Sequence, residues 1–152
     1  MARSPIQVFV IPFRRGTDSR PEYALFHRSD EPYWQVLAGG AEDDETPLEA
    51  AHREAYEEAR IPLEKPFCML ATVASVPRCY FKRTGHWPKS QYIVPGYYFA
   101  VDAAGVDIQL SYEHTQWGWF GCEEAMSKPK WDDDRSAIWE LDQRLLANDL
   151  SS

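Results

Sequence analysis

Residues 39–61 read GGAEDDETPLEAAHREAYEEARI, and this stretch decides which fold the chain can adopt. Residues 46–49 (TPLE) predict a helix start, because Thr is a favoured N-cap, Pro is favoured at the first helical position, and Glu at the third closes a capping box. Apolar and mostly small residues then recur at helical spacing, namely Leu48, Ala51, Ala55 and Ala59. We therefore predict a helix over residues 46–59 that lies close to a sheet and is ended by Pro62.

The same predicted helix carries three carboxylates on one side. Glu54, Glu57 and Glu58 stand at i, i+3 and i+4, which at about 100° per residue places them within one arc. Like charges at i and i+4 destabilise a helix by roughly a few tenths of a kcal/mol unless a cation lies between them. Oxygen ligands of this kind suit hard divalent cations, and Mg²⁺ in particular. A solvated acidic helix face is the alternative interpretation, and these three positions alone do not exclude it.

The longer pattern around these carboxylates resembles the Nudix box, G-x5-E-x7-R-E-U-x-E-E-x-G-U, in which U is a bulky aliphatic residue. Seven positions match at the required spacing, namely Gly39, Glu45, Arg53, Glu54, Glu57, Glu58 and Ile61. Two positions differ, because Ala55 is smaller than the usual aliphatic residue and Arg60 replaces the usual Gly. Neither difference removes an expected metal ligand.

The resemblance to the Nudix family implies an α+β fold, a Nudix-type α/β/α sandwich around a mixed β-sheet. It implies one Nudix hydrolase domain over residues 1–152 and an enzyme, a pyrophosphohydrolase acting on acid anhydrides. It also implies a Mg²⁺ cofactor, with Mn²⁺ as the alternative.

The resemblance further assigns roles to residues of the box. Glu54, Glu57 and Glu58 are expected to hold the metal, and Glu54 and Glu57 are also catalytic candidates. Arg53 is expected to hold a glutamate in position, and Glu45 to brace the loop against the helix. At the other end of the box, the Gly39-Gly40 turn is expected to bring the backbone close to the metal-bound phosphates, with Gly39 in the metal site and Gly40 in a structural role.

A second, looser resemblance spans residues 5–145 and points to the Nudix subgroup that hydrolyses dATP and dihydroneopterin triphosphate. Three residue pairs carry it, namely Trp34-Gln35, Glu113-His114 and Trp119-Phe120. In that subgroup a glutamate just before a late strand contributes to the metal site, and Glu113 matches it. A general base must reach the attacking water, and Glu113 and Glu54 are the two candidates. A surface turn residue is the alternative interpretation of Glu113.

Three residues outside the box are candidates for substrate binding. Arg28 follows the second predicted strand and Arg3 precedes the first, and the guanidinium group suits bidentate contacts with phosphate. Trp34 is a candidate for stacking on a base or pterin, with packing in the core as the alternative.

Short apolar runs on both sides of the predicted helix indicate strands. These runs cover residues 6–13, 23–27, 33–37, 67–76, 92–101 and 116–120. A polar turn separates the first two runs, so we expect those strands to pair. A closing helix is predicted over residues 132–148, since its initial Asp cluster suits the helix dipole. This order of elements favours an α+β or mixed-sheet layer fold.

The formal charge of −8 excludes general binding to nucleic acid, because a polyanion is repelled by the average surface. The charge is unevenly distributed. Residues 42–58 contain eight acids and one base, whereas residues 65–101 contain five bases and no acid. An acidic centre beside a basic flank is what a site for a metal and phosphates needs, although two ordinary solvated faces would give the same pattern.

Cysteine usage and hydropathy bear on the cellular compartment. Cys68, Cys79 and Cys122 lack metal-binding spacing and indicate free thiols in a reducing cytosol. No run of 18 apolar residues exists, and the N-terminus lacks the apolar core of a signal peptide. We therefore expect a cytoplasmic protein without a membrane partner. Aromatic residues make up 14% of the chain and either line a ligand surface or cover sheet faces.

Together these features predict hydrolysis of a diphosphate linkage in a nucleoside or pterin triphosphate, by attack of water at phosphorus, to give a monophosphate and pyrophosphate. The expected partner is a small phosphorylated substrate, most simply a nucleotide. Three alternatives stay open, namely a dinucleoside polyphosphate or nucleotide-sugar pyrophosphatase, a non-catalytic Nudix-like domain that binds a nucleotide, and a purely structural acidic domain. The sequence is silent on the oligomeric state.

Overall fold

A seven-stranded sheet forms the centre of the computed structural model, which describes residues 2–151. The strands are β1 (Arg3–Arg15), β2 (Pro21–Arg28), β3 (Trp34–Gln35), β4 (Leu37–Glu42), β5 (Phe67–Pro77), β6 (Ile93–Asp102) and β7 (His114–Phe120). Strand β1 pairs parallel with β6 and antiparallel with β2 and β4. The sheet is therefore mixed, and the first two strands pair as the sequence predicts.

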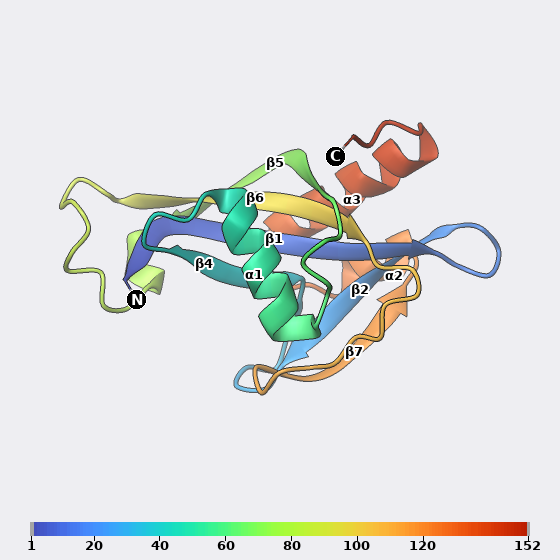
Figure 1. The fold of residues 1–152 in the computed structure, drawn as a ribbon, viewed down its shortest axis with the longest axis horizontal. Coiled ribbons are helices and arrows are strands. Elements are labelled where there is room, and N and C mark those ends of the chain that lie inside the picture. The colour runs from blue at the N-terminus through green and yellow to red at the C-terminus, as the bar shows by residue number, and fades with distance from the viewer. Residues whose placement is uncertain (1, 152) are drawn as a thin grey trace.

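Helices cover both faces of this sheet. Helix α1 (Pro47–Ala59) lies on one face, and the other carries α2 (Cys122–Ser127) and α3 (Asp132–Leu146) (Figure 1). Strand β1 contributes to both cores, because Val8 and Val10 pack in the cluster under α1 whereas Ile11 and Phe13 pack in the cluster under α3. The prediction of an α/β/α sandwich around a mixed sheet is confirmed. No helix within residues 2–151 has the length and apolar character that crossing a membrane requires.

Helix α1 begins as its sequence predicts. The Thr46 side chain accepts a hydrogen bond from the Glu49 amide at 3.2 Å, and the Glu49 carboxylate accepts one from the Thr46 amide at 2.9 Å. The buried side of the helix consists largely of alanines, namely Ala50, Ala51, Ala55 and Ala59. Because these side chains are small, the helix lies close to the sheet and its glutamates reach strand β4.

Helix α1 ends at Ala59, as the sequence predicts, and Arg60 is its C-cap residue. Arg60 adopts the left-handed conformation, with φ 58° and ψ 33°, and its amide donates to the carbonyl groups of Ala55 and Tyr56. Glycine, the usual residue at this position of the Nudix box, would adopt this conformation without strain because it has no Cβ. Arg60 therefore carries a conformational strain that glycine would relieve.

Substituting Arg60 tests this strain. The guanidinium group lies 4.9 Å from the centre of the Tyr56 ring, so R60G and R60A both lose that contact, but only R60G relieves the left-handed strain. We expect R60G to exceed R60A in free energy of unfolding by about 1 kcal/mol, as measured by urea denaturation. Equal stability of the two variants would contradict a left-handed Arg60.

Three elements differ from the sequence-based expectation. Residues 33–37 were expected to form one strand before a glycine turn, but the chain forms β3 and then β4, which contains both glycines. Gly39 and Gly40 pair with Val8 and Gln7 of β1, so the backbone pairing overrides the turn preference of glycine. Helix α2 and the short 3-10 helix Arg78–Tyr80 were not expected, because neither is long enough to show a helical apolar period.

Strand β5 is irregular where it passes helix α3. Its register against β6 shifts between Met69 and Val73. Within this irregularity the amides of Ala71 and Thr72 donate to the Glu140 carboxylate at 2.6 and 2.7 Å. A side chain of α3 thus satisfies backbone groups of β5 and fastens the helix to the strand.

Candidate active site

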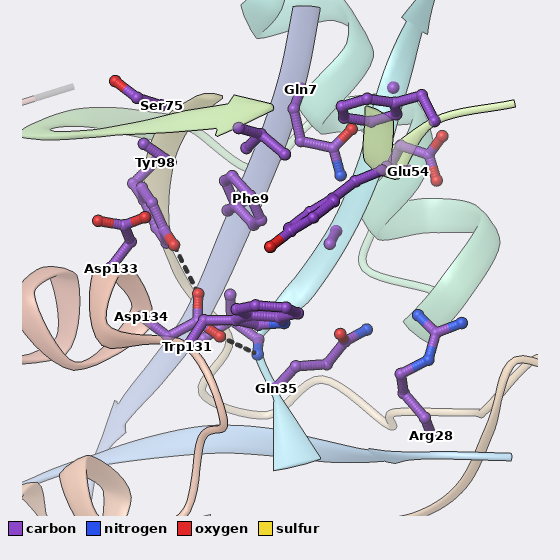
Figure 2. Close-up of a pocket in the computed structure, with 18 of the residues that line it drawn as sticks. Gln7, Phe9, Arg28, Gln35, Glu54, Ser75, Tyr98, Trp131, Asp133 and Asp134 are labelled. Carbon is purple, nitrogen blue, oxygen red and sulfur yellow. Dashed lines mark hydrogen bonds between the residues drawn. The ribbon is translucent and has the colours of Figure 1, made fainter. Parts of the chain in front are cut away.

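A cavity of about 630 Å³ opens beside the glutamate face of α1. It is lined by residues of β1, β4 and β5, by Glu54 of α1, and by the first residues of α3. Figure 2 shows Glu54 and Arg28 on one side of this cavity and Tyr98 and Asp134 on the other. The cavity therefore lies between the glutamate helix on one side and a set of aromatic and acidic side chains on the other.

Arg53 connects the loop, the helix and strand β4. Its guanidinium group donates two hydrogen bonds to Glu45 at 2.8 and 2.9 Å, one to Glu54 at 3.0 Å, and one to Glu57 at 3.2 Å. It also donates to the carbonyl oxygen of Gly40 at 2.9 Å. The hydrogen bond from Arg53 is the main cause that lowers the pKa of Glu45. Arg53 therefore orients two carboxylates of the helix.

The two glycines of β4 leave room for side chains that point at the cavity. A Cβ at Gly39 would lie 2.1 Å from Cδ of Glu54, and a Cβ at Gly40 would lie 2.4 Å from Nε of Arg3. Any side chain larger than hydrogen would displace these groups. Glycine is thus required here for close approach to a carboxylate and a guanidinium group, and not for an unusual backbone angle.

Glu58 and Glu54 are buried carboxylates on adjacent turns of α1. Glu58 is 1% exposed, and within residues 2–151 neither of its carboxylate oxygens has a hydrogen-bond partner. Burial, followed by the neighbouring Glu54, raises the pKa of Glu58 well above its usual range. Burial also raises the pKa of Glu54. Buried oxygens without partners are costly, so these positions favour a bound cation.

His114 lies next to Glu58 but does not neutralise it. The Nδ1 atom of His114 is 3.9 Å from Oε1 of Glu58. Burial, together with nearby Arg28, lowers the pKa of His114 to about 4, so its ring is neutral at pH 7. A neutral ring supplies no counter-charge to a carboxylate.

Glu113 and Arg28 line the cavity together. The Glu113 carbonyl accepts hydrogen bonds from the amide and hydroxyl of Ser29, which ties the loop before β7 to the end of β2. Burial raises the pKa of Glu113, while the charge of Arg28 acts in the opposite direction. Arg28 itself donates two hydrogen bonds to Asp30, both 2.7 Å long.

Arg3 lines the cavity near Glu54. Its Nη2 atom donates to Gln7 at 2.6 Å, and its guanidinium carbon lies 4.9 Å from the centre of the Phe81 ring. The Arg3 carbonyl accepts a hydrogen bond from the Trp87 indole at 2.7 Å. The loop after β5 therefore holds both the backbone and the side chain of Arg3.

Comparisons with known proteins agree with this geometry. The family model for the NUDIX domain matches residues 4–141. The chain belongs to the Nudix family. A protein described as a NUDIX hydrolase from Listeria monocytogenes is 35% identical in its crystal structure, with a TM-score of 0.88, and the match covers 98% of this chain and 99% of that one. The prediction of an enzyme of the Nudix pyrophosphohydrolase class is confirmed.

Two further solved structures share the fold. The Escherichia coli dihydroneopterin triphosphate pyrophosphohydrolase is 22% identical with a TM-score of 0.71, and the match covers 91% of this chain and 94% of that one. An Ap4A hydrolase from Caenorhabditis elegans is 20% identical with a TM-score of 0.72, over 93% and 97% of the two chains. No curated protein sequence matches the chain.

The Nudix box supplies donors that fit a hard divalent cation. The orphaned oxygens of Glu58, and the room that Gly39 leaves for Glu54, are the features that such an ion requires. Glu57 is more exposed and turns toward Arg53. Within residues 2–151, no three Asp, Glu, His or Cys side chains converge on one metal position as they stand. Ligands from a substrate and water would therefore complete the shell, as is usual for Mg²⁺.

Trp34 does not line the cavity. Its ring packs edge-on against His27 at 5.3 Å and against Phe120 at 5.6 Å. The side chain of Lys128 covers the same ring at 5.3 Å. The structure thus places Trp34 in the packing of β2, β3 and β7, which was the alternative interpretation, and not with the other candidate residues.

The far side of the cavity contains residues that the sequence did not single out. The rings of Phe9 and Tyr98 stack with centres 4.4 Å apart, and Trp131 and Asp133 lie at the start of α3. The Asp cluster was interpreted only as a partner of the helix dipole. The run of aspartates after Trp131 was the only sequence signal, and it does not reveal that Asp133 and Asp134 line a cavity whereas Asp132 does not.

Asp134 is the buried member of this cluster. The Tyr98 hydroxyl donates to its Oδ1 at 2.5 Å, and the Val36 amide donates to its Oδ2 at 3.4 Å. Burial raises the pKa of Asp134 to about 6, although both hydrogen bonds act in the opposite direction. The ionised form of this carboxyl group is therefore disfavoured in the folded protein.

This raised pKa predicts a pH-dependent difference in stability. The folded protein binds the Asp134 proton more tightly than the unfolded chain, so wild type loses stability as pH rises from the unfolded pKa toward 6. The free energy of unfolding of D134N minus that of wild type is expected to rise by about 2 kcal/mol from pH 4.5 to pH 7.5. Urea denaturation of both proteins at the two pH values measures this difference. D132N, which alters an exposed neighbour, should show no such trend, and a flat D134N difference would contradict the burial argument.

Proposed function

We propose that this Nudix domain hydrolyses a diphosphate linkage in a nucleoside or pterin triphosphate with Mg²⁺ as cofactor, releasing a monophosphate and pyrophosphate. One observation carries the proposal. Two carboxylates, Glu54 and Glu113, and two guanidinium groups, Arg3 and Arg28, line the same cavity. Carboxylates suit a divalent cation and arginines suit the oxygens of phosphate. The names of the E. coli and C. elegans structures, which refer to dihydroneopterin triphosphate and Ap4A, support a substrate of this class.

The metal would be held by carboxylates of the box. We assign Glu54, Glu57 and Glu58 to it, with Glu113 and the Gly39 backbone as further contributors. When bound, such a cation neutralises charge on the phosphates and lowers the pKa of a water molecule. Mn²⁺ has the same preference for oxygen ligands and is expected to substitute.

The protein's own residues bind the substrate and move one proton. Arg28, oriented by Asp30, and Arg3, oriented by Gln7, would bind phosphate oxygens. The water oxygen forms a bond to phosphorus, the bond from that phosphorus to the bridging oxygen breaks, and pyrophosphate leaves. Glu113 would accept the proton of the water at a carboxylate oxygen, with Glu54 as the second candidate.

A substrate panel tests the proposed function. Pyrophosphate release is measured with and without Mg²⁺ on dATP, dGTP, dihydroneopterin triphosphate, a dinucleoside tetraphosphate and a nucleotide sugar, and the products are identified by mass. We expect metal-dependent release from at least one triphosphate. Cleavage restricted to the dinucleotide or the nucleotide sugar would replace the proposed substrate class with another. No cleavage of any compound, despite binding, would favour the non-catalytic alternative.

Calorimetry of metal binding separates an enzyme from a structural acidic domain. Wild type should bind Mg²⁺ or Mn²⁺, and E57Q should bind more weakly. E49Q is the matched control, because Glu49 lies on the same helix and glutamine preserves the capping box. No heat of divalent binding in wild type would support the structural alternative.

A further inference from the structure

His114 and Glu58 form a buried pair of polar side chains where helix α1 meets the start of β7. Their side chains are 0% and 1% exposed, and Nδ1 of His114 lies 3.9 Å from Oε1 of Glu58. Within residues 2–151, neither this nitrogen nor either oxygen of Glu58 has a hydrogen-bond partner. Buried polar atoms without partners are costly and rare. Two of them that face each other therefore indicate a role beyond packing.

Backbone hydrogen bonds hold the imidazole of His114 beside this carboxylate. The Ser111 amide donates to the Glu58 carbonyl at 3.3 Å, and the His114 amide donates to the Ser111 carbonyl at 3.4 Å. The Gln109 amide donates to the Ala59 carbonyl at 3.2 Å. The segment that leads to Glu113 and His114 is therefore fastened to the last turn of α1.

Gln35 and Glu58 determine which ring nitrogen of His114 carries the proton. Gln35 lines the cavity (Figure 2), and its Nε2 lies 3.4 Å from Nε2 of His114. An amide nitrogen only donates, so Nε2 of His114 accepts and the ring proton is on Nδ1. Glu58 leads to the same assignment, because a carboxylate that binds a cation only accepts and the nitrogen facing it must donate.

We propose that His114 is a positioning residue for the metal site, in which its Nδ1–H donates to Oε1 of Glu58 and leaves the other oxygen free for the cation. This inference rests on the proposed function and adds a residue outside the Nudix box to those that prepare the site. Hydrogen bonds to a metal-binding group fix its orientation and raise metal affinity. The 3.9 Å separation exceeds a hydrogen bond by about 1 Å, and a small rotation of either side chain closes it.

Packing alone does not account for a histidine at this position. The ring of His114 packs at a tilt against Phe26, with centres 5.5 Å apart. An apolar side chain would fill the same space without a buried nitrogen that lacks a partner, and would lose only the long hydrogen bond to Gln35. The polar ring is therefore explained by the carboxylate that it faces.

NMR of the metal-free protein tests the position of the proton. The nitrogen chemical shifts of an imidazole distinguish a proton on Nδ1 from one on Nε2, and the signals lost in H114N identify those of His114. We expect the Nδ1–H form in wild type at neutral pH. A proton on Nε2 would overturn the inference. Because the tautomer is measured in wild type, this result stands even where a variant is poorly folded.

Metal binding by H114L and H114N tests the role of the donor. Asparagine keeps an N–H donor at the δ position, whereas leucine has the same branched shape and no donor. Calorimetry is carried out with Mg²⁺ alone and with Mn²⁺ alone. We expect H114L to bind either ion about 10- to 100-fold more weakly than wild type, and H114N to stay within about threefold of it.

Two controls separate this effect from damage to the fold. H52L removes another half-buried histidine, one that packs against Phe67 and does not line the cavity, and it should bind Mg²⁺ as wild type does. Urea denaturation of each metal-free variant measures folding independently. On a triphosphate that wild type hydrolyses, H114L should need more Mg²⁺ for half-maximal kcat, while KM for the triphosphate changes less than about twofold.

The binding measurements need no turnover, so failure of this inference is distinct from failure of the proposed function. Weaker binding in H114L that H114N restores, without hydrolysis of any triphosphate, would support the role of His114 and overturn the proposed function. Hydrolysis by wild type, with equal Mg²⁺ affinity in wild type and H114L, would overturn the inference and leave the proposed function in place. Equal weakening in H114L and H114N would assign His114 to packing and also overturn the inference.

Discussion

E54Q is expected to lower kcat by about 10²- to 10⁴-fold, the range associated with loss of a positioned acid–base group or a metal-held carboxylate. Glu54 lies where the helix meets strand β4, in contact with Arg53 and against the Gly39 backbone. Glutamine has the same size but no charge, so the shape of the site is preserved. Steady-state pyrophosphate release at saturating Mg²⁺ measures the effect.

A stability measurement separates loss of catalysis from loss of folding in E54Q. Glu54 and Glu58 are like charges on adjacent turns, and both are largely buried. Removing one charge in metal-free protein is expected to preserve or raise the free energy of unfolding. E49Q should leave kcat and the free energy of unfolding unchanged, because glutamine preserves the capping box at the start of α1. A kcat for E54Q within threefold of wild type would exclude Glu54 as a general base and as an essential metal ligand.

G39A is expected to be the most damaging small substitution, with a loss of activity of at least about 10²-fold. The added methyl group would lie 2.1 Å from Cδ of Glu54, a separation that non-bonded carbon atoms do not tolerate. Either the Glu54 side chain or strand β4 must move, and both form part of the cavity wall. Activity and thermal melting are measured on the same preparation.

G85A is the control for G39A. A Cβ at Gly85 would meet nothing within 4 Å, so it tests the conformational effect of a Gly-to-Ala change without a clash. We expect G85A to retain activity. If G39A retained activity as well, the close approach of the Gly39 backbone to Glu54 would not matter for catalysis.

Local patterns allowed much of the box region to be predicted. The capping box, the alanine face and the Arg53 contacts all depend on residues close in sequence, and spacing along one helix determines them. Arg3 and Arg28 also line the cavity, as expected for their candidate role. Their roles, like those of the glutamates, stay predictions until substrate or metal binding is measured.

Contacts between distant segments could not be predicted in the same way. Tyr98 lies in β6 and Asp134 in α3, and they meet only when the helix docks on the sheet. Trp34 showed the same limitation, since a tryptophan in a strand gives no sign of which face it occupies. Strand β4 was missed because its glycines suggested a turn, whereas pairing with β1 decides the outcome.

The bond between Glu140 and the irregular part of β5 has a mechanical consequence for the cavity. Ser75 and Val76 of β5 and the first turn of α3 form parts of its wall. Because the Ala71 and Thr72 amides donate to Glu140 of α3, these hydrogen bonds hold the two parts of the wall together. Widening the cavity would require breaking these hydrogen bonds, so we expect its side chains, and not a change in its width, to set which substrate it accepts.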